Sequence, residues 1–387
     1  MREVAIIGIG QTKIDENWDK SLRELAGDAA LAALLDSGLQ KVDSVYVGNM
    51  ISGSANHQQH LGSYIADWIG LRYTEAFRLE AACSSGAASF RTAVMAVASG
   101  QVESALAIGV EKMTDSPGNE ITAELATAAD ADWESGQGLS FVALNALIMR
   151  RYMHEYGWRK EDFALFSVNA HANAMHNPFA RFHEPTSVDQ YMKAAMIADP
   201  INLMDASAIG DGAAAVVVVP LEIVKKSSQK IIRVAASSAA TDTIAIDHRK
   251  NPLWLSAAEK SSKQAYSQSG LSPADIDLFE LHDAFSIMAV LSLEANGFIE
   301  KGKGPLLALE GEILPGGKVP IATRGGLKAR GHPVGATGMY QIVEVVQQLR
   351  GEAFGSQVEG ASVGMSQNIG GSGSNIITHI FQVVKSN

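Results

Sequence analysis

The sequence predicts an α/β fold made of two similar halves that stack five layers deep, as α/β/α/β/α, with an inserted loop domain. Strand-like apolar segments alternate with helix-like segments along the chain, which indicates sheets rich in parallel strands and covered by helices on both faces. One helix-to-strand pattern occurs twice within the 387 residues. A stretch from about 114 to 200, rich in charged residues, aromatic residues and histidine, interrupts the first half.

The repeated pattern is a helix followed by a strand that is entered through an aspartate. Each helix is predicted to begin at a Ser-x-x-Glu capping box, in which the two side chains satisfy free backbone N–H groups, and to end at a glycine. The two boxes are Ser21 with Glu24 and Ser256 with Glu259. The helices are expected at 21–37 and 256–269, and the strands at 42–48 and 276–281.

Each half then contains a strand-to-helix turn made of small residues. In the first half, an apolar approach meets Cys83 and a helix that ends near Gly100. In the second half, residues 331–338 lead into a helix that runs through Ile342 and Leu349. Further strands are expected at 4–8, 105–110, 211–219 and 361–365.

The expected domain division is an N-terminal half of residues 1–225 and a C-terminal half of residues 226–387. The insertion of about 114–200 belongs to the N-terminal half, because the apolar run at 211–219 is typical of a returning core strand. The insertion should contain a helix near 140–156. Long insertions between core strands often form substrate-binding lids or loop domains.

Composition and charge exclude several classes of protein. A net charge of −11 argues against nucleic acid as the main partner, because phosphate backbones bind basic surfaces. The single cysteine excludes a disulfide framework and a thiolate zinc cluster. No apolar run is long enough to span a bilayer, and the chain opens on a strand-like segment rather than a secretion leader. We therefore expect a cytoplasmic protein that binds neither nucleic acid nor membrane.

Cys83 is the first candidate catalytic residue. It lies where a helix is predicted to begin, between an apolar approach and the small residues Ser84–Ala88. The positive end of a helix dipole favours the thiolate and lowers the pKa of a cysteine placed there. This pattern is typical of a nucleophile on a strand-to-helix elbow. A lone intracellular cysteine is also commonly a buried, inert thiol, and the local sequence leaves both interpretations open.

Two histidine segments offer partners for Cys83. His282 and Asp283 follow a predicted strand, and ligands bind at strand ends in open α/β sheets. A histidine there can donate its ring N–H to a developing oxyanion, although a structural histidine fits the same pattern. His332 lies among the glycines of residues 325–338 and is a candidate base for a thiol. A phosphate-binding loop competes for this segment, but the G-x-x-x-x-G-K-[ST] order is absent.

Three further segments carry weaker signals. Gln367–Gly373 can supply backbone N–H groups to an oxyanion hole, and it equally fits a glycine turn between strands. His57 and His60 suggest a metal pair, but no third ligand is near, so we interpret their segment as a polar helix face. A basic group suits either a phosphorylated ligand or a solvated helix face. Its members are Arg150, Arg151, Arg159, Lys160 and Arg181.

Together these segments resemble the motifs of the thiolase superfamily over essentially the whole chain. Cys83–Gly86 resembles its nucleophile loop, and His282–Phe285 resembles the histidine loop of the sterol-carrier-protein-like branch. Gly331–Pro333 resembles the Gly-His-Pro loop, and Asn368–Gly371 resembles the final glycine loop. The block from Gly325 to Gly338 is a very specific match. The archaeal-type acetoacetyl-CoA thiolases are the branch that this chain resembles most.

The resemblance implies a role for each candidate residue. Cys83 takes the acyl group as a thioester, and His332 removes the thiol proton. His282 helps to hold the thioester oxygen of the second acyl-CoA. The N–H groups of Cys83 and Gly370 would form the oxyanion hole of the acyl-enzyme. The residues implied to support these loops are Asn368 and Asp283.

The implied reaction is a reversible Claisen condensation of two acyl-CoA molecules, most simply two acetyl-CoA giving acetoacetyl-CoA and CoA. CoA thioesters are the substrates, and no cofactor or metal is implied. The insertion would cover CoA, with its basic residues near the phosphates. The family forms homodimers or tetramers. Archaeal-type members can assemble with hydroxymethylglutaryl-CoA (HMG-CoA) synthase and a small zinc-ribbon/OB-fold protein, which implies a place in lipid metabolism, on the mevalonate route to isoprenoids.

The chain departs from most thiolases because it has no second cysteine. Asn368 occupies the place of that cysteine in the final loop, and Ala284 occupies the place used by much of the sterol-carrier-protein-like branch. The base that forms the enolate must then be His332, His282 or water. Three alternatives stay open: a decarboxylating condensing enzyme of the ketoacyl-synthase type, a thiolase-fold aldolase, and an acyl-CoA-binding subunit without catalytic activity.

Overall fold

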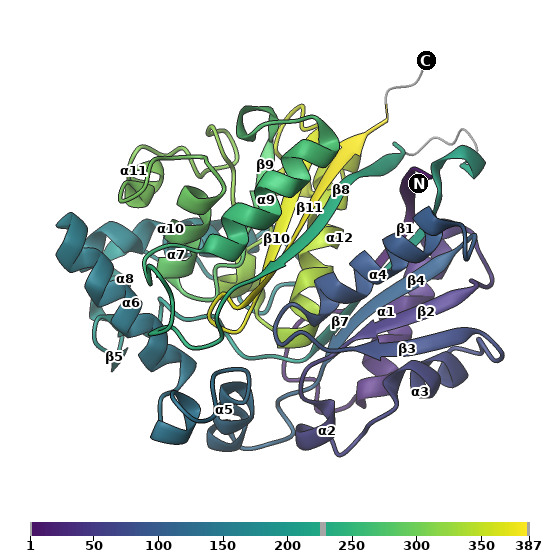
Figure 1. Ribbon diagram of the computed structural model, residues 1–387, viewed down its shortest axis with the longest axis horizontal. Helices are drawn as coiled ribbons and strands as arrows, with labels where there is room; N and C mark the ends of the chain where they lie inside the picture. The colour runs from purple at the N-terminus through teal and green to yellow at the C-terminus, as the bar shows by residue number, and fades with distance from the viewer. Residues whose placement is uncertain (1, 225–229, 385–387) are drawn as a thin grey trace.

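A computed structural model describes residues 2–224 and 230–384 of the protein. Nine strands of this part form one mixed sheet (Figure 1). The predicted boundary between residues 225 and 226 lies outside the described residues, and the domain division stays a prediction. In order across the sheet, the strands are β3 (Glu75–Leu79), β2 (Ser44–Gly48), β4 (Ala105–Glu111), β7 (Gly212–Pro220), β1 (Val4–Gln11), β8 (Ile232–Thr241), β11 (Asn375–Val383), β10 (Val363–Gly370) and β9 (Leu278–Glu280).

The strand order repeats between the two halves. The first half reads β3-β2-β4-β7-β1 from the edge of the sheet inward. The second half reads β9-β10-β11-β8, and Ile321 adds a parallel bridge to Phe279 beside β9, in the place that β3 takes in the first half. The helix-to-strand repeat in the sequence therefore corresponds to a repeat in topology, and the predicted α/β fold of two similar halves is confirmed.

The two halves share one sheet, which the sequence did not predict. β1 and β8 pair antiparallel through Ala5 with Arg233 and Ile6 with Ile232. The prediction of parallel strands holds for β2 with β3, β2 with β4, and β9 with β10. It is wrong for the inner strands, where β4–β7, β7–β1, β10–β11 and β11–β8 are antiparallel. β10 passes into β11 through a short glycine turn, which allows only an antiparallel pair, because a parallel pairing needs a longer crossover connection.

The helices complete five layers. α4 (Ser85–Ser99) and α12 (Thr337–Arg350) form the central layer between the strands of the two halves. α12 is buried along almost its whole length because it packs on strands from both halves. The outer layer of the first half contains α1 (Leu22–Ser37) and α3 (Leu61–Trp68). The outer layer of the second half contains α9 (Ser256–Ser269) and α10 (Ser286–Ala295).

The two predicted capping boxes differ in outcome. At the start of α1, the Glu24 carboxylate accepts from the backbone N–H of Ser21 at 2.8 Å, and the capping box is confirmed. At α9 the prediction is wrong, because Ser256 is already helical and Glu259 accepts from the indole of Trp254 at 2.7 Å instead. Both helices end at a left-handed glycine, as predicted. Within the described ranges, no helix is long and apolar enough to cross a membrane.

Between β4 and β7 the chain leaves the sheet and folds against the second half. Side chains of this segment share one core cluster with α9 and α10. The elements of this segment are α5 (Gly118–Ala126), α6 (Phe141–Tyr156), α7 (Ala164–Ala174), α8 (Val188–Lys193), β5 (Met196–Ala198) and β6 (Ile201–Asn202). In Figure 1, α6, α7 and α8 lie beside α10. The remaining short helices are α2 (Ser52–Ala55) and α11 (Gly304–Leu309).

Candidate active site

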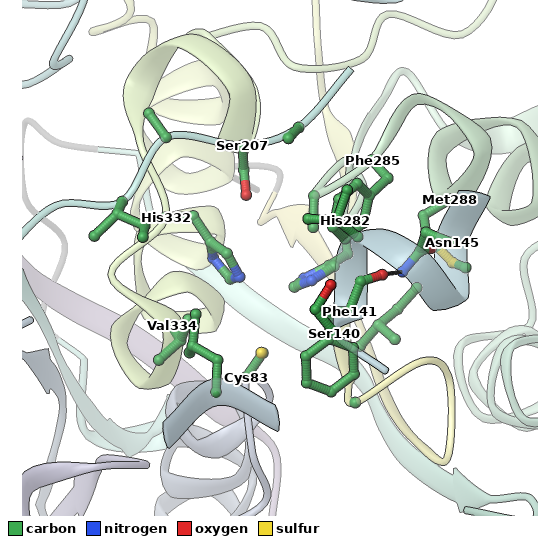
Figure 2. A pocket seen from close by; sticks show the side chains of 18 of the residues that line it. Cys83, Ser140, Phe141, Asn145, Ser207, His282, Phe285, Met288, His332 and Val334 are labelled. Carbon is green, nitrogen blue, oxygen red and sulfur yellow. Dashed lines mark hydrogen bonds between the residues drawn. The ribbon is translucent and has the colours of Figure 1, made fainter. Parts of the chain in front are cut away.

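A cavity of about 160 Å³ lies where the two halves meet the segment between β4 and β7. Cys83, His282 and His332 line it together, although they are far apart in the sequence (Figure 2). The segment between β4 and β7 supplies an apolar wall that includes Leu125 and Phe141. Figure 2 shows both imidazole rings pointing into the space above the cysteine sulfur. The structure thus brings together the three residues that the sequence singled out as catalytic.

Cys83 lies on a tight elbow between β3 and α4. Ala82 takes a left-handed conformation, with φ of 50°, which is uncommon for a residue with a side chain. The hydroxyl of Ser84 donates to the carbonyl of Ala81 at 2.6 Å. The hydroxyl of Ser85 donates to the carbonyl of Ala82 at 2.6 Å and accepts from the N–H of Ala81 at 2.9 Å. The two serines therefore hold the elbow in its strained shape.

The predicted lowering of the Cys83 pKa is wrong. Burial raises the pKa of the thiol to about 12, and the nearby carboxylate of Glu111 adds to the rise. The N–H groups of Gly371 and of Cys83 itself favour the thiolate, but they offset only part of the effect of burial. Cys83 is therefore a neutral thiol at physiological pH, and it needs a base to react as a nucleophile.

His332 is placed to be that base. It stands just before α12, where its backbone N–H donates to the carbonyl of Ala208 at 2.8 Å. Its Nδ1 lies 2.6 Å from Oγ1 of Thr337. Burial, and then the neighbouring His282 and Arg330, lower the pKa of His332 well below its usual range. The ring is therefore neutral and can accept a proton.

His282 occupies the opposite side of the cavity, just after β9. Its ring meets the His332 ring edge-on, with centroids 5.1 Å apart and an interplanar angle of 85°. Its Nδ1 lies 2.9 Å from Nδ2 of Asn368. Burial, and then the charge of Arg330, lower the pKa of His282 to about 3. Both histidines are therefore neutral side by side, which avoids two adjacent buried charges.

The other predicted site residues surround this centre without lining the cavity. Asp283 is turned toward the glycine-rich loop, where its carboxylate accepts from the N–H of Leu327 at 2.7 Å. Gly370 packs against the cysteine elbow, and a methyl group there would lie 2.6 Å from the carbonyl oxygen of Ala81. The adjacent Gly371 lines the cavity. The roles implied for Asp283 and Gly370 stay predictions.

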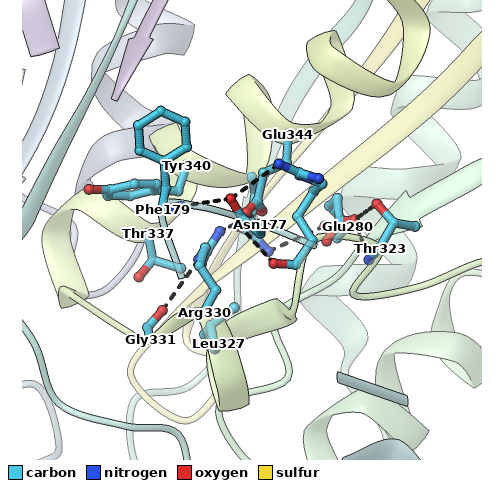
Figure 3. A network of polar contacts seen from close by, with 12 residues as sticks. Asn177, Phe179, Glu280, Thr323, Leu327, Arg330, Gly331, Thr337, Tyr340 and Glu344 are labelled. Atoms are coloured by element: carbon cyan, nitrogen blue, oxygen red, sulfur yellow. Dashed lines mark hydrogen bonds and ion pairs between the residues drawn. The ribbon is translucent and has the colours of Figure 1, made fainter. Parts of the chain in front are cut away.

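Buried polar contacts fix the glycine-rich loop that carries His332 (Figure 3). Arg330 donates to Glu344 on α12 at 2.6 Å, and both side chains are fully buried. The hydroxyl of Thr323 donates to Glu280 at 2.5 Å. Because breaking a buried ion pair leaves an unpaired charge in the interior, this network resists movement of the loop.

Glu111 is a residue that the sequence reasoning missed. It ends β4, and its carboxylate accepts from the N–H groups of Met50 at 2.8 Å, Ile51 at 3.1 Å and Gly335 at 2.9 Å. It therefore ties the loop after His332 to the first half of the molecule. Burial raises the pKa of Glu111 to about 7. The available signal was an acidic residue directly after the apolar strand at 105–110.

Most of the predicted basic group is occupied by acidic partners. Ion pairs join Arg150 to Asp199, Arg151 to Glu155, Arg159 to Glu161 and Arg181 to Glu16. The first three arginines are largely exposed, as expected of a solvated surface. Arg181 differs, because it lines a hollow with Lys328 that shares Ser207 and Ala208 with the catalytic cavity.

The proposed polar helix face at His57 and His60 is wrong. Both histidines are exposed, but they lie in the loop between α2 and α3, and both have left-handed backbone conformations. Among residues 2–224 and 230–384, no group of three or more His, Cys, Asp or Glu side chains could hold a metal ion.

Comparison with known proteins agrees with this arrangement. Residues 4–222 match the family described as thiolase, N-terminal domain, and residues 238–383 match the family described as thiolase C-terminal domain-like. The chain is 45% identical to an acetyl-CoA acetyltransferase of Methanothermobacter thermautotrophicus, over 98% of this chain and all of the relative. It is 39% identical to that of Methanocaldococcus jannaschii, over 98% of this chain and 99% of the relative.

A solved structure shows the same fold. The Ltp2–ChsH2(DUF35) aldolase superposes with a TM-score of 0.86 at 25% identity, over 98% of each chain. The two family matches together span almost the whole chain, and they agree with the motifs that meet in the cavity. The chain therefore belongs to the thiolase family.

Proposed function

We propose that this protein is an acetyl-CoA C-acetyltransferase that joins two acetyl-CoA into acetoacetyl-CoA and CoA, and catalyses the reverse thiolysis. The observation that carries the proposal is the meeting of a neutral thiol, Cys83, with two neutral histidines in one cavity. The acetyl-CoA acetyltransferases that resemble the chain along its full length support acetyl-CoA as the substrate.

The first half-reaction follows from the protonation states. His332 Nε2 takes the proton of the Cys83 thiol as the sulfur attacks the thioester carbon of acetyl-CoA. The tetrahedral intermediate then collapses, the bond to the CoA sulfur breaks, and CoA leaves with the proton returned by His332. The oxyanion of this intermediate is held by the N–H of Cys83 and by the glycine loop at 370–371.

Coenzyme A enters, in this proposal, through the hollow that adjoins the catalytic cavity. Ser207 and Ala208 line both spaces, so the two spaces adjoin each other, and this supports the proposed route. Arg181 lines the outer hollow, and in this proposal it exchanges its ion pair with Glu16 for a CoA phosphate. Lys328 also lines the hollow, but it is almost fully buried and its Nζ donates to the carbonyl of Asp205. Of the predicted basic group, Arg181 is therefore the residue that we assign to CoA.

We extend the proposal to the oligomeric state, the cellular location and the partners of the protein. We propose a homodimer or tetramer in the cytoplasm, acting in isoprenoid synthesis with HMG-CoA synthase and a small zinc-ribbon/OB-fold protein. The similar aldolase is named as a complex of Ltp2 with ChsH2(DUF35), which supports a partner protein for this fold.

The test is intact-mass spectrometry after exposure to acetyl-CoA, combined with turnover of acetoacetyl-CoA plus CoA. Because Cys83 is the only cysteine, one acetyl adduct on the protein reports directly on it. We expect the adduct in the native chain, none in Cys83→Ala or His332→Ala, and partial acylation in His282→Ala. A native chain without adduct would favour a non-catalytic subunit or an aldolase. Condensation with malonyl-CoA alone would favour the decarboxylating enzyme.

A further inference from the structure

We propose that Asn368 and Gln341 are positioning residues that hold His282 as its Nε2–H tautomer, so that His282 can only donate to the substrate and His332 carries both proton transfers. The inference rests on the proposed function and identifies the group that replaces the second cysteine of other thiolases. Backbone carbonyls set the direction of a chain of buried hydrogen bonds that leads from Gln341 through Asn368 to His282.

The orientation of the Gln341 amide is fixed first. Gln341 lies on α12 and is almost fully buried. Its Nε2 lies 2.8 Å from the carbonyl oxygen of Leu281, 3.2 Å from that of Gln367 and 3.3 Å from that of Glu280. Carbonyl oxygens only accept hydrogen bonds, so the NH₂ group must face them. Oε1 of Gln341 must therefore face Asn368.

The orientation of Asn368 follows from that of Gln341. Nδ2 of Asn368 lies 2.9 Å from Oε1 of Gln341, and the reversed amide would press two oxygens together. Oδ1 of Asn368 lies beside Gly338, and a methyl group added to that glycine would be 2.7 Å from this oxygen. That oxygen has no hydrogen-bond partner among the described residues. Leaving this oxygen buried without a partner costs free energy. The same orientation of the amide places the NH₂ group of Asn368 on the opposite side, where both of its hydrogens can be donated.

The tautomer of His282 follows in turn. The NH₂ group of Asn368 has two hydrogens, one directed to Gln341 and the other to Nδ1 of His282 at 2.9 Å. Nδ1 therefore accepts a hydrogen bond, and a neutral ring must carry its proton on Nε2. Because its Nε2 already holds a proton, His282 cannot remove one from a substrate.

His332 has the opposite tautomer. The hydroxyl of Thr337 donates to the carbonyl of Pro333 at 3.3 Å, and its oxygen lies 2.6 Å from Nδ1 of His332. A hydroxyl has one hydrogen, so here its oxygen accepts from Nδ1–H and leaves the lone pair of Nε2 free. The cavity thus contains one imidazole donor and one imidazole acceptor, both directed at the space beside Cys83 (Figure 2).

This pair suffices for the condensation step. His332 Nε2 takes a methyl proton from the second acetyl-CoA, and the electrons of the C–H bond form the enolate, whose oxygen accepts from His282 Nε2–H. The enolate carbon attacks the thioester carbon on Cys83. The C–S bond then breaks, and the departing Cys83 thiolate takes the proton from His332. The proton removed from carbon ends on sulfur, and no second cysteine is required.

The tautomer can be measured directly. In the full chain labelled with ¹⁵N-histidine, with His282 assigned by comparison with His282→Gln, we expect Nε2 of His282 to be protonated and Nδ1 unprotonated from pH 6 to 9. In Asn368→Asp an oxygen faces Nδ1, and we expect the proton to appear there. Asn296→Asp is the matched control, because Asn296 is equally buried, pairs with Gln367 at 2.8 Å and has no hydrogen bond to either histidine.

Kinetics separate positioning from general damage. A misdirected oxyanion donor should lower condensation by about 10²-fold, by the usual effect of losing one such donor. Acetylation of Cys83 depends on His332 and should change only a few-fold in Asn368→Asp. Asn296→Asp should change both rates by the same factor.

Two results would overturn the inference. One is a native spectrum with the proton of His282 on Nδ1. The other is an Asn368→Asp variant that loses acetylation and condensation equally, as a purely structural residue would. The native spectrum decides the tautomer even where a variant fails to fold. A native chain that never acetylates Cys83 would instead defeat the proposed function, and the two failures are therefore distinguishable.

Discussion

Burial decides the protonation of Cys83, although the residue stands next to the start of a helix. A helix N-terminus stabilises an adjacent anion by about 0.3–1 kcal/mol. The rise of the Cys83 pKa from 9.0 to about 12 corresponds to about 4 kcal/mol in the opposite direction. The enzyme therefore rests with a neutral thiol and a neutral imidazole rather than a thiolate–imidazolium pair. This state limits side reactions of the thiol between turnovers.

The expected outcome is that alkylation of Cys83 by iodoacetamide accelerates about tenfold for each unit of pH between 6 and 10, because the thiolate fraction grows so far below a pKa of about 12. Intact-mass spectrometry follows the reaction at this single cysteine, with Cys83→Ala as the blank. A rate that levels off below pH 9 would mean that the helix and His332 stabilise the thiolate after all.

The sequence predicted individual site residues where those residues belong to a short, recognisable motif. Cys83, His282 and His332 each stand in a recognisable local segment, and the structure places all three on one cavity. Gln341 and Glu111 stand in ordinary helix and strand patterns. Their importance arises from contacts with distant segments of the chain, such as Leu281 for Gln341, 60 residues away, and Gly335 for Glu111, 224 residues away. A single sequence without its fold does not show such contacts.

At the scale of elements, the N-terminal ends of α4 and α12 bring the cysteine and histidine loops together. The backbones of the two helical segments come into close contact where glycine residues face each other. A methyl group on Gly86 would lie 2.8 Å from the carbonyl oxygen of Gly335 and 2.9 Å from the backbone nitrogen of Met339. Both neighbours are backbone atoms, which cannot rotate away. The spacing between Cys83 and His332 therefore depends on Gly86 having no side chain.

Gly86→Ala should therefore reduce both stability and activity. The overpacking costs about 1–3 kcal/mol, which exceeds the gain of about 1 kcal/mol from placing alanine in a helix. A shift of one loop against the other should also lower kcat at least about tenfold. Thermal melting and steady-state turnover measure the two effects. Gly118→Ala is the control, because that glycine has open space around it. Equal behaviour of the two variants would contradict a close approach at Gly86.

Element prediction succeeded where local signals were complete. The Ser21 box, the glycine ends of α1 and α9, and the helix at 140–156 follow from caps and periodicity and are present. The second box failed because the Trp254 indole offers Glu259 another donor. That contact depends on how the preceding loop folds back, which the Ser-x-x-Glu pattern does not contain.

At the scale of the whole molecule, the repeat was visible in the sequence and the joining of the halves was not. β8 was not predicted, and β11 was predicted only as the strand that would follow a glycine turn at Gln367–Gly373. Yet β8 makes the shared sheet, because its start pairs with β1. The register of such a long-range pairing depends on contacts between the two halves. Local pattern alone does not specify it.

The shared sheet has two ends, and they differ in a way that predicts assembly. Beyond β9, Ile321 forms a bridge that covers the edge. Beyond β3, no strand of the described chain pairs, and Phe77 on β3 is 55% exposed. An open edge with exposed aromatic side chains is a template for pairing with another strand.

We therefore expect two copies to pair through β3, and the native chain to scatter light with at least twice the 41.0 kDa of one chain. Phe77→Lys should shift the protein toward the monomer, because a charged edge strand resists pairing. Phe354→Lys, at an exposed phenylalanine distant in the sequence, should leave the mass unchanged. A native monomer, or a Phe77→Lys variant with the native mass, would show that β3 is not the interface.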